Sequence, residues 1–227
     1  MTTAWTAADN VALLNVDPQD TFCPGGALGV TDGDQIIPVL NSLREHFNKV
    51  YWTQDFHPDG HISFASTHGE AEYSEKDVDY GKQMMWPEHA KQSASDGTGA
   101  QFHKDLAFKA SDKIIQKGTN KDIDSYSAFL ENDKKTAPRF DNGNSLAEEL
   151  RTDGVDTLVI TGLALDYCAG DTALDALTEK FNVIVIEDAT RSITPEGRLA
   201  KIAQIVDAGG IVMTSAALQR NPQLIAA

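Results

Sequence analysis

The segment TLVITGLALDYCAGDTALDALTEK, residues 157–180, carries the pattern that decides the fold. Its first part, Thr157 to Gly162, is a short apolar run that predicts a buried strand. Leu163 to Tyr167 predicts a turn. Cys168 to Lys180 has apolar residues at three- and four-residue spacing, which predicts a helix. A buried strand therefore leads directly into a helix that begins at a cysteine.

The same alternation of apolar runs and helical patterns recurs along the chain. The other predicted strands are Val11 to Val16, Lys49 to Thr53, Lys113 to Gln116, Asn182 to Ile186 and Ile211 to Thr214. The other predicted helices are Asp34 to Phe47, Ser145 to Asp153 and Pro195 to Ala208. Strands that alternate with helices need right-handed crossovers, which cover both faces of a sheet. We expect an α/β fold, a three-layer α/β/α sandwich with a mostly parallel six-stranded sheet.

Two polar stretches interrupt this alternation, Ser63 to Leu106 and Gly118 to Gly143. Both are longer than the loops that usually connect elements in compact domains. We interpret them as the cover of an active site. Neither repeats nor a linker divide the chain, so we expect a single domain over residues 1–227.

Composition argues against several classes of protein. The chain has 227 residues, 41% of them hydrophobic, and a formal charge of −15. A negative charge of this size repels nucleic acids and anionic lipids, and no basic patch offsets it. Apolar runs fall well short of the roughly 20 residues that span a bilayer. With two cysteines, Cys23 and Cys168, and no signal-peptide pattern in residues 1–10, we expect a reduced, cytoplasmic protein, either a monomer or a homo-oligomer.

Chemically useful residues stand at the ends of four predicted strands. Asp17 follows the first strand, Asp55 and His57 follow the second, Lys117 ends the third and Cys168 follows the fourth. Ligands of open α/β sheets bind beyond the carboxyl ends of the strands. We therefore expect these side chains to converge on one edge of the sheet.

Cys168 is a candidate nucleophile. The partial positive charge at a helix N-terminus stabilises a thiolate and can hold an oxyanion. Asp17 could accept the thiol proton, and Lys117 could keep that carboxylate ionised. Each residue also has an ordinary interpretation: Cys168 as a small core residue beside an Asp166 cap, Asp17 as a turn residue, and Lys117 as a solvated strand end.

A metal site is the second chemical prediction. Asp55 and His57 are two residues apart in extended chain, so their side chains project to the same side. His61 follows after a turn, and His89 lies in the first polar stretch. A carboxylate with imidazoles suits zinc, iron or manganese. A lone histidine in a loop is ordinarily just exposed, but four ligand-type residues on one rim favour a catalytic metal site.

Six short motifs, spread over nearly the whole chain, resemble one family when they are taken together. They are Val16-Asp17-Pro18-Gln19 with Phe22-Cys23-Pro24-Gly25-Gly26, Thr53-Gln54-Asp55-Phe56-His57-Pro58, His61-Ile62-Ser63-Phe64-Ala65, Trp86-Pro87-Glu88-His89, Lys117-Gly118 and Gly162-Leu163-Ala164-Leu165-Asp166-Tyr167-Cys168. In this order and spacing they resemble the nicotinamidase or pyrazinamidase branch of the isochorismatase-like cysteine hydrolases.

The resemblance implies a role for each candidate residue. Cys168 would be the nucleophile, Asp17 the base and Lys117 its partner. One divalent metal ion, zinc by first choice and iron or manganese otherwise, would be bound by Asp55, His57 and His89. In some members of the family the residue matching His61 is a fourth ligand, and in others it lies behind the ligands.

The resemblance also implies a substrate and its pocket. The substrate would be a small amide, nicotinamide, hydrolysed to nicotinate and ammonia through a cysteine thioester. Phe22, Trp86 and Tyr126 would form an aromatic pocket wall. A cis peptide would join Leu163 to Ala164, and the N–H groups of Ala164 and Cys168 would form the oxyanion hole.

The chain departs from the family pattern at a few positions beside these residues. Pro18 stands where the family commonly has valine, Ala90 where it has cysteine, and Ala128 where it has glycine. These departures affect the shape of the pocket rather than the triad. The alternatives are another amidohydrolase acting on a different small amide or carbamoyl substrate, and a metal- or ligand-binding module without catalysis.

Overall fold

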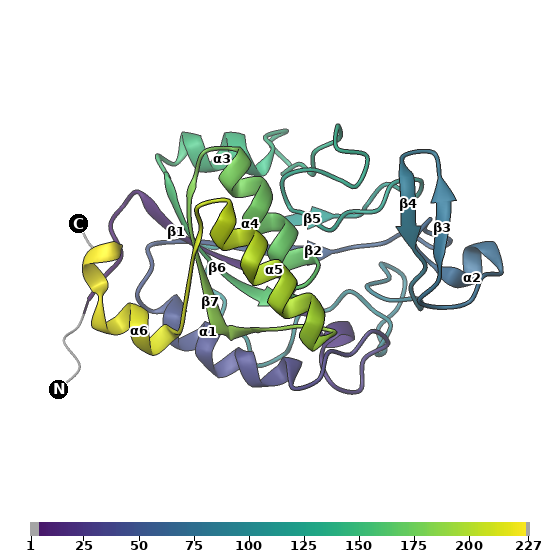
Figure 1. Cartoon of the computed structure of the whole chain (residues 1–227), viewed down its shortest axis with the longest axis horizontal. Coiled ribbons are helices and arrows are strands. Elements are labelled where there is room, and N and C mark those ends of the chain that lie inside the picture. Colours follow the sequence, from purple (N-terminus) through teal and green to yellow (C-terminus); the bar gives the residue numbers. More distant parts are fainter. Residues whose placement is uncertain (1–4, 226–227) are drawn as a thin grey trace.

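Six parallel strands form the central sheet of the computed structural model, which describes residues 5–225 (Figure 1). They are β1 (Val11–Val16), β2 (Lys49–Asp55), β5 (Lys113–Lys117), β6 (Thr157–Leu163), β7 (Asn182–Arg191) and β8 (Ile211–Met213). Their order is β5-β2-β1-β6-β7-β8, and every neighbouring pair is parallel. The predicted α/β fold with its parallel six-stranded sheet is confirmed.

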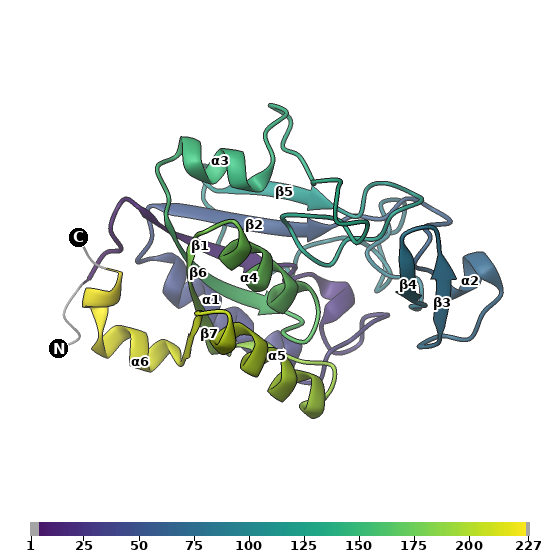
Figure 2. The same ribbon diagram turned by 45° about the horizontal axis from the view of Figure 1, so that its top comes forward.

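Helices cover both faces of this sheet and bury two separate apolar cores. One core includes side chains of α1 (Ile37–Arg44) and α6 (Ser215–Arg220). The other includes side chains of α3 (Leu146–Thr152), α4 (Cys168–Thr178) and α5 (Pro195–Asp207). Figure 2 shows α4 and α5 lying side by side, as they also do in Figure 1. The three predicted layers are therefore present.

The central strand β1 is apolar at every position except Asn15. Val11 and Leu13 pack in the core of α1, whereas Ala12, Leu14 and Val16 pack in the core of α4. Successive side chains of a strand point to opposite faces, and here both faces are covered by helices. A strand buried on both sides reads as a continuous apolar run.

The predicted helix Asp34 to Phe47 was wrong at both ends. Its first residues lie in a 3-10 turn, Gly33–Ile36, and α1 begins only at Ile37. The helix ends at Arg44, because His46 and Phe47 form tighter hydrogen bonds to carbonyls three residues back. Tight turns of this kind are frequent at helix ends.

Several strands run further than their apolar runs predicted. β2 continues to Asp55, β5 to Lys117 and β6 to Leu163. β7 was predicted to end at Ile186 but continues to Arg191, and its pairing with β6 resumes beyond a register shift. Polar residues near the strand ends hide this extension in the sequence. Two of the added residues, Asp55 and Lys117, contact each other at 3.0 Å.

The first polar stretch contains structure that the sequence analysis missed. It holds a short helix, α2 (Ala65–His68), and an antiparallel hairpin of β3 (Glu75–Val78) and β4 (Gly81–Met84). The hairpin is polar and largely exposed, so it lacks the apolar alternation by which strands are recognised. In Figure 1 it lies at the opposite end of the molecule from α6. The second stretch, Gly118 to Gly143, has neither helix nor strand, as predicted.

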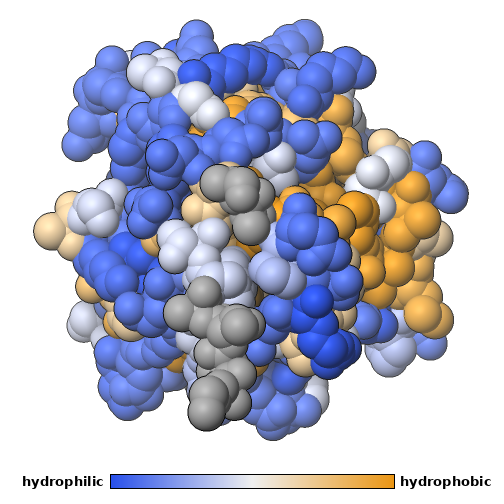
Figure 3. Space-filling view, turned by 90° about the vertical axis from the view of Figure 1, so that its left-hand side faces the viewer, coloured by the Kyte–Doolittle hydropathy of each residue, from blue (hydrophilic) through white to orange (hydrophobic). Residues whose placement is uncertain are grey.

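The face shown in Figure 3 is mainly hydrophilic, with an apolar area on its right-hand side. Large apolar side chains that remain exposed include Leu199 and Val206 of α5 and Ile211 of β8. Over residues 5–225, none of the helices combines the length and the apolar character that crossing a membrane requires.

Candidate active site

Lys117, the last residue of β5, is fully buried and stands at the centre of the site. Its Nζ lies 3.0 Å from Asp17 Oδ2 and 3.0 Å from Asp55 Oδ1. It donates hydrogen bonds to the Ser125 carbonyl, 2.7 Å away, and to Cys168 Sγ, 3.6 Å away. One ammonium group therefore connects two carboxylates and the thiol, which brings together residues from four strand ends.

Asp17 lies directly after β1 in a backbone conformation that is uncommon for residues other than glycine. Its φ of 46° is in the left-handed region, which disfavours side chains with a Cβ. The backbone N–H donates to Thr53 Oγ1 at 3.0 Å, and the Thr53 hydroxyl donates back to Asp17 Oδ1. Such backbone strain persists where surrounding contacts impose it, and it concentrates at functional sites. Thr53 was not among the predicted site residues.

The ionisation of the Asp17–Lys117 pair follows from burial and charge. Burial raises the pKa of Asp17, and the nearby Lys117 only partly offsets this effect. Burial would lower the pKa of Lys117, but the charges of Asp17, Asp55 and Cys168 raise it well above its usual range. Lys117 therefore stays charged, while Asp17 becomes a stronger base than an ordinary aspartate.

Cys168 is the first residue of α4 and lies beside Lys117, as predicted. Burial raises the pKa of Cys168 well above its usual value, and Lys117 lowers it by less. Burial thus favours the thiol form, so attack by this sulfur would need a base. Asp166 does not cap the helix: the N-cap is Tyr167, and the Asp166 carboxylate accepts from the N–H groups of Ile193 and Thr194.

Asp55, His57 and His89 form a compact buried group of metal-ligand type. Asp55 Oδ2 lies 3.0 Å from His57 Nε2 and 3.5 Å from His89 Nε2. Each histidine donates its Nδ1 proton to a backbone carbonyl, His57 to Gly118 at 2.9 Å and His89 to Pro87 at 2.8 Å. With each Nδ1 turned to a carbonyl, both Nε2 atoms face the carboxylate.

This group fits a divalent cation. His57 Nε2 is buried and has no hydrogen-bond partner within residues 5–225, although it faces Asp55 at 3.0 Å. An unpartnered buried nitrogen opposite a carboxylate is costly unless a cation satisfies both. The pKa of Asp55 supports this assignment: burial raises it, but His57 and Lys117 hold it well below its usual range, so the carboxylate is ionised.

Gly118 is required by the position of His57. Its φ is 62°, and a Cβ at this position would lie 2.4 Å from His57 Cε1. The absence of a side chain lets the Gly118 carbonyl approach the imidazole and orient it.

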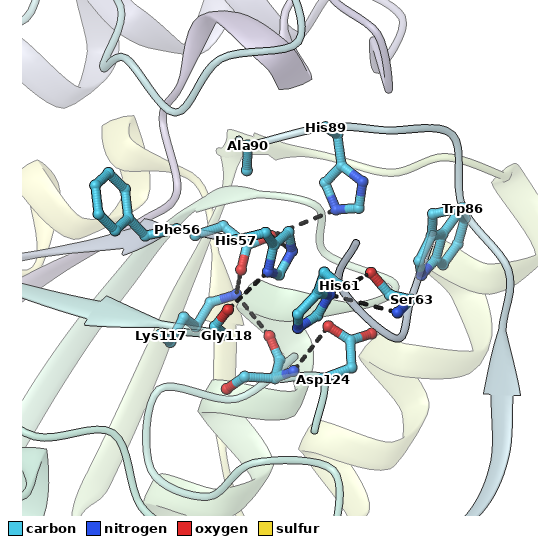
Figure 4. Close-up of polar contacts among 12 residues, drawn as sticks. Phe56, His57, His61, Ser63, Trp86, His89, Ala90, Lys117, Gly118 and Asp124 are labelled. Carbon is cyan, nitrogen blue, oxygen red and sulfur yellow. Dashed lines mark hydrogen bonds and ion pairs between the residues drawn. The ribbon is translucent and has the colours of Figure 1, made fainter. Parts of the chain in front are cut away.

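His61 lies beside this group but does not point into it. Its ring stacks on that of His57, with centroids 3.9 Å apart. His61 Nδ1 is 2.8 Å from Ser63 Oγ, and Nε2 donates to the Ile123 carbonyl at 3.3 Å. Burial and the neighbouring His57 lower the pKa of His61 to about 2. Figure 4 shows His89 on one side of His57 and His61 on the other.

A pocket opens beside the thiol and contains the three predicted aromatic residues, Phe22, Trp86 and Tyr126. Trp86 Nε1 donates to the Tyr126 hydroxyl at 3.2 Å. The pocket also reaches Asp55, His89, Ala164 and Cys168. Its remaining lining was missed by the sequence analysis and consists of Leu28, Val30, Asp124, Tyr167 and Ile193.

The backbone before α4 presents two donors to this pocket. The Leu163–Ala164 peptide is cis, as the resemblance implied. Within the described part of the chain, neither Ala164 N–H nor Cys168 N–H donates a hydrogen bond. Because both residues line the pocket, their N–H groups are available to a ligand oxygen.

A protein-family model described as the isochorismatase domain matches residues 11–217. The chain belongs to the isochorismatase family. Among its relatives in that family, the nicotinamidase of Acinetobacter baylyi is 42% identical over 205 residues, which cover 90% of this chain and 92% of that protein.

Solved structures of isochorismatase-family relatives agree with this assignment. A nicotinamidase/pyrazinamidase of Acinetobacter baumanii is similar with a TM-score of 0.86 and 41% identity, covering 93% of this chain and 99% of that one. A Pyrococcus horikoshii pyrazinamidase in complex with zinc is similar with a TM-score of 0.72 and 32% identity, covering 90% and 99%.

One departure from the isochorismatase-family pattern contacts the site directly. Ala90, where the family commonly has cysteine, is buried and has a φ of 47°. Its carbonyl accepts a hydrogen bond from the His57 N–H at 2.8 Å. This contact uses the backbone, so the substitution does not remove it.

Proposed function

We propose that this protein is a nicotinamidase, which hydrolyses nicotinamide to nicotinate and ammonia. The observation that carries the proposal is the single buried ammonium of Lys117, which contacts Asp17, Asp55 and Cys168 beside the Asp55–His57–His89 group. This arrangement joins a nucleophile, a base and a metal-ligand set at one pocket. The names of the relatives support the choice of amide.

The proposed reaction begins with attack of sulfur on the amide carbon. Asp17 accepts the Cys168 proton as the carbon–sulfur bond forms, and the N–H groups of Ala164 and Cys168 hold the resulting oxyanion. Protonated Asp17 then gives its proton to the amide nitrogen, the carbon–nitrogen bond breaks, and ammonia leaves a thioester. Lys117 remains protonated throughout. Its positive charge stabilises the Asp17 carboxylate and the sulfur of Cys168 as that sulfur loses its proton.

Hydrolysis of the thioester returns the enzyme to its starting state. Asp17 accepts a proton from the attacking water as the new carbon–oxygen bond forms. The same two N–H groups hold the second oxyanion. When the carbon–sulfur bond breaks, Cys168 recovers its proton from Asp17, and the product acid leaves and gives its carboxyl proton to solvent as nicotinate.

Asp55, His57 and His89 would hold one divalent ion, and we propose zinc, which a pyrazinamidase relative binds. When bound, the ion would supply a Lewis acid for an electron-pair donor such as a pyridine nitrogen. Phe22, Trp86 and Tyr126 would stack against the flat ring and exclude water from it.

Ammonia release from nicotinamide, measured before and after chelation with metal content determined on the same sample, tests this proposal. We expect release by the metal-replete protein, loss on chelation and recovery on addition of zinc, iron or manganese. If a folded, metal-replete sample releases no ammonia, the substrate is a different amide or a carbamoyl compound.

We also propose that residues 1–227 form one domain and that the protein acts in the cytoplasm. Both cysteines, Cys23 and Cys168, are free thiols, which suits a reducing compartment. Cys23 is buried, and burial raises its pKa to about 12, so we assign it a structural role.

A further inference from the structure

Thr53 is a buried polar residue beside the site that the proposed reaction does not use. It lies on β2 and is fully buried. Its Oγ1 accepts a hydrogen bond from the Asp17 N–H at 3.0 Å, and its hydroxyl proton is donated to Asp17 Oδ1. One hydroxyl therefore contacts both the backbone and the carboxylate of the proposed base.

The bond to the backbone supports an uncommon conformation. Asp17 has a φ of 46°, in the left-handed region that residues with a Cβ rarely adopt. Its N–H is buried and uses Thr53 Oγ1 as acceptor, and a buried N–H that loses its acceptor costs free energy. The Thr53 hydroxyl thus stabilises the turn that carries the carboxylate beyond the end of β1.

The bond to the side chain gives the two oxygens of Asp17 different surroundings. Oδ1 accepts from the Thr53 hydroxyl, whereas Oδ2 lies 3.0 Å from Lys117 Nζ and has no further hydrogen-bond partner within residues 5–225. Lys117 Nζ in turn lies 3.6 Å from Cys168 Sγ. A carboxylate is rigid and planar, so a bond that holds one oxygen also fixes the direction of the other.

We propose that Thr53 is a positioning residue for the base: its hydroxyl holds Asp17 so that Oδ2 faces Lys117 and accepts the Cys168 proton. Thr53 acts through Asp17 alone, because it is not among the residues that line the substrate pocket in the described part of the chain. This inference rests on the proposed function, in which Asp17 is the base.

The same hydroxyl affects the ionisation of Asp17. Burial has the largest effect and raises the pKa of Asp17, while the charge of Lys117 lowers it and that of Asp55 raises it. The hydrogen bond from Thr53 lowers this pKa, because it stabilises the ionised carboxylate. Cys168, on α4, is the other titratable group that faces the carboxylate. Without the hydroxyl, Asp17 should therefore bind its proton at a higher pH.

Thr53→Val tests the proposal, because it replaces the hydroxyl by a methyl group of similar size and removes both bonds to Asp17. We expect kcat for nicotinamide to fall by about 10- to 100-fold, with KM within about threefold of the wild type. The acidic limb of the pH profile of kcat/KM should move to higher pH. Thr53→Ser keeps a hydroxyl and should retain kcat within about threefold.

Thr161→Val is the matched control. Thr161 is fully buried on β6, and its hydroxyl donates to Asn15 Oδ1 at 2.7 Å. The variant loses a buried hydroxyl bond to a residue of β1, as Thr53→Val loses its bonds just beyond that strand. It should lower the temperature of unfolding but leave kcat and the pH profile within about twofold of the wild type. Circular dichroism and thermal unfolding give the folded fraction of every variant.

A second measurement needs no turnover. Carboxyl ¹³C NMR titration of Asp17 should show a higher pKa in Thr53→Val than in the wild type, and Thr53→Ser should resemble the wild type. Thr161→Val should also titrate like the wild type.

Three results would overturn the positioning role. They are wild-type kcat in Thr53→Val, a loss in Thr53→Ser as large as that in Thr53→Val, or an equal loss in Thr161→Val. An Asp17 titration that Thr53→Val leaves unchanged would also contradict it. Failure of the proposed function is recognised separately, since the folded, metal-replete wild type would then release no ammonia while the NMR comparison of the variants still held.

Discussion

Two buried ion clusters lie in this protein, and their hydrogen bonding differs. Arg44 and Asp112 are both 2% exposed, and Arg44 donates to both carboxylate oxygens. Arg44 also donates to the Phe47 carbonyl, and Trp52 Nε1 donates to Asp112. In the Lys117 cluster, by contrast, the one ammonium is shared by Asp17 Oδ2 and Asp55 Oδ1, each 3.0 Å away, and His57 Nε2 is buried without a hydrogen-bond partner among the residues described.

The difference separates a cluster that holds the fold together from one that is built to react. A buried charge pair with all its hydrogen bonds made is at its lowest energy without any ligand. A cluster with a shared ammonium, an unpartnered buried nitrogen and a base of raised pKa gains interactions when a proton, ion or substrate arrives. Substitutions in the two clusters should therefore affect different quantities.

The largest expected effect is that of Cys168→Ala on turnover. Without the sulfur no thioester can form, so kcat should fall by at least about 10⁴-fold. The fold should be retained, because the side chain that is removed is small and carries no hydrogen bond on which a strand or helix depends. Ammonia release and thermal unfolding, measured on the same preparation, check both statements. Substantial remaining activity would exclude the covalent route.

Lys117→Met should come next, with a loss of about 10²- to 10³-fold in kcat/KM. Its ammonium offsets the charge of Asp17 and lies beside the sulfur, and methionine fills a similar volume without the charge. Steady-state kinetics on the folded fraction measure this loss. Activity within a few-fold of the wild type would mean that Lys117 stabilises the fold, as Arg44 does, and does not contribute to catalysis.

Arg44→Met should show the opposite pattern. Removing one partner of a buried pair should lower the free energy of unfolding by about 3–5 kcal/mol, because Asp112 keeps an uncompensated charge. Turnover per folded molecule should stay within about twofold. Urea unfolding measures the first quantity and kinetics the second. The double variant Arg44→Met/Asp112→Leu should recover part of the stability, and failure to do so would show that the cost comes from lost packing.

The smallest expected effect concerns Glu149, another charge whose hydrogen bonds are made. Lys113, Asn142 and Asn144 donate to its carboxylate and lower its pKa from 4.5 to about 2. Because the folded-state pKa is depressed, the stabilisation is present above pH 4.5 and is lost as the pH falls toward 2.

The size of this contribution is at most about 3 kcal/mol. The free energy of unfolding should therefore fall more steeply between pH 4.5 and 2 for the wild type than for Glu149→Gln. Equal slopes would mean that the carboxylate titrates normally in the folded protein.

Much of the fold could be predicted because its determinants are local. Each of the six strands contains an apolar run, and β1 is apolar apart from Asn15 because helices cover both of its faces. The hairpin of β3 and β4 could not be predicted in this way. Its residues are polar, and its position depends on contacts with distant chain, such as that of Gln83 with Asp124, 41 residues further on.

Site residues that lie in recognisable motifs could be predicted from the sequence. Pocket residues that lie outside such motifs could not. Asp17, Lys117 and Cys168 follow strand ends, and Phe22, Trp86 and Tyr126 lie within or beside recognisable motifs; the structure brings all of them to one pocket or its floor. Asp124 and Val30 line the same pocket without any such signal. Which residues line a pocket together depends on how segments that are distant in sequence are placed in the folded chain.

The sequence by itself determined the layered α/β fold and the residues able to act as nucleophile, base and metal ligands. These depend on periodicity and on residue chemistry, which are properties of the chain alone. Tertiary contacts set the burial that raises the pKa of Cys168, and they pair Arg44 with one carboxylate while Lys117 contacts two carboxylates and the thiol. The physical reason is that pKa values and hydrogen-bond satisfaction depend on desolvation and on charges that are distant in sequence.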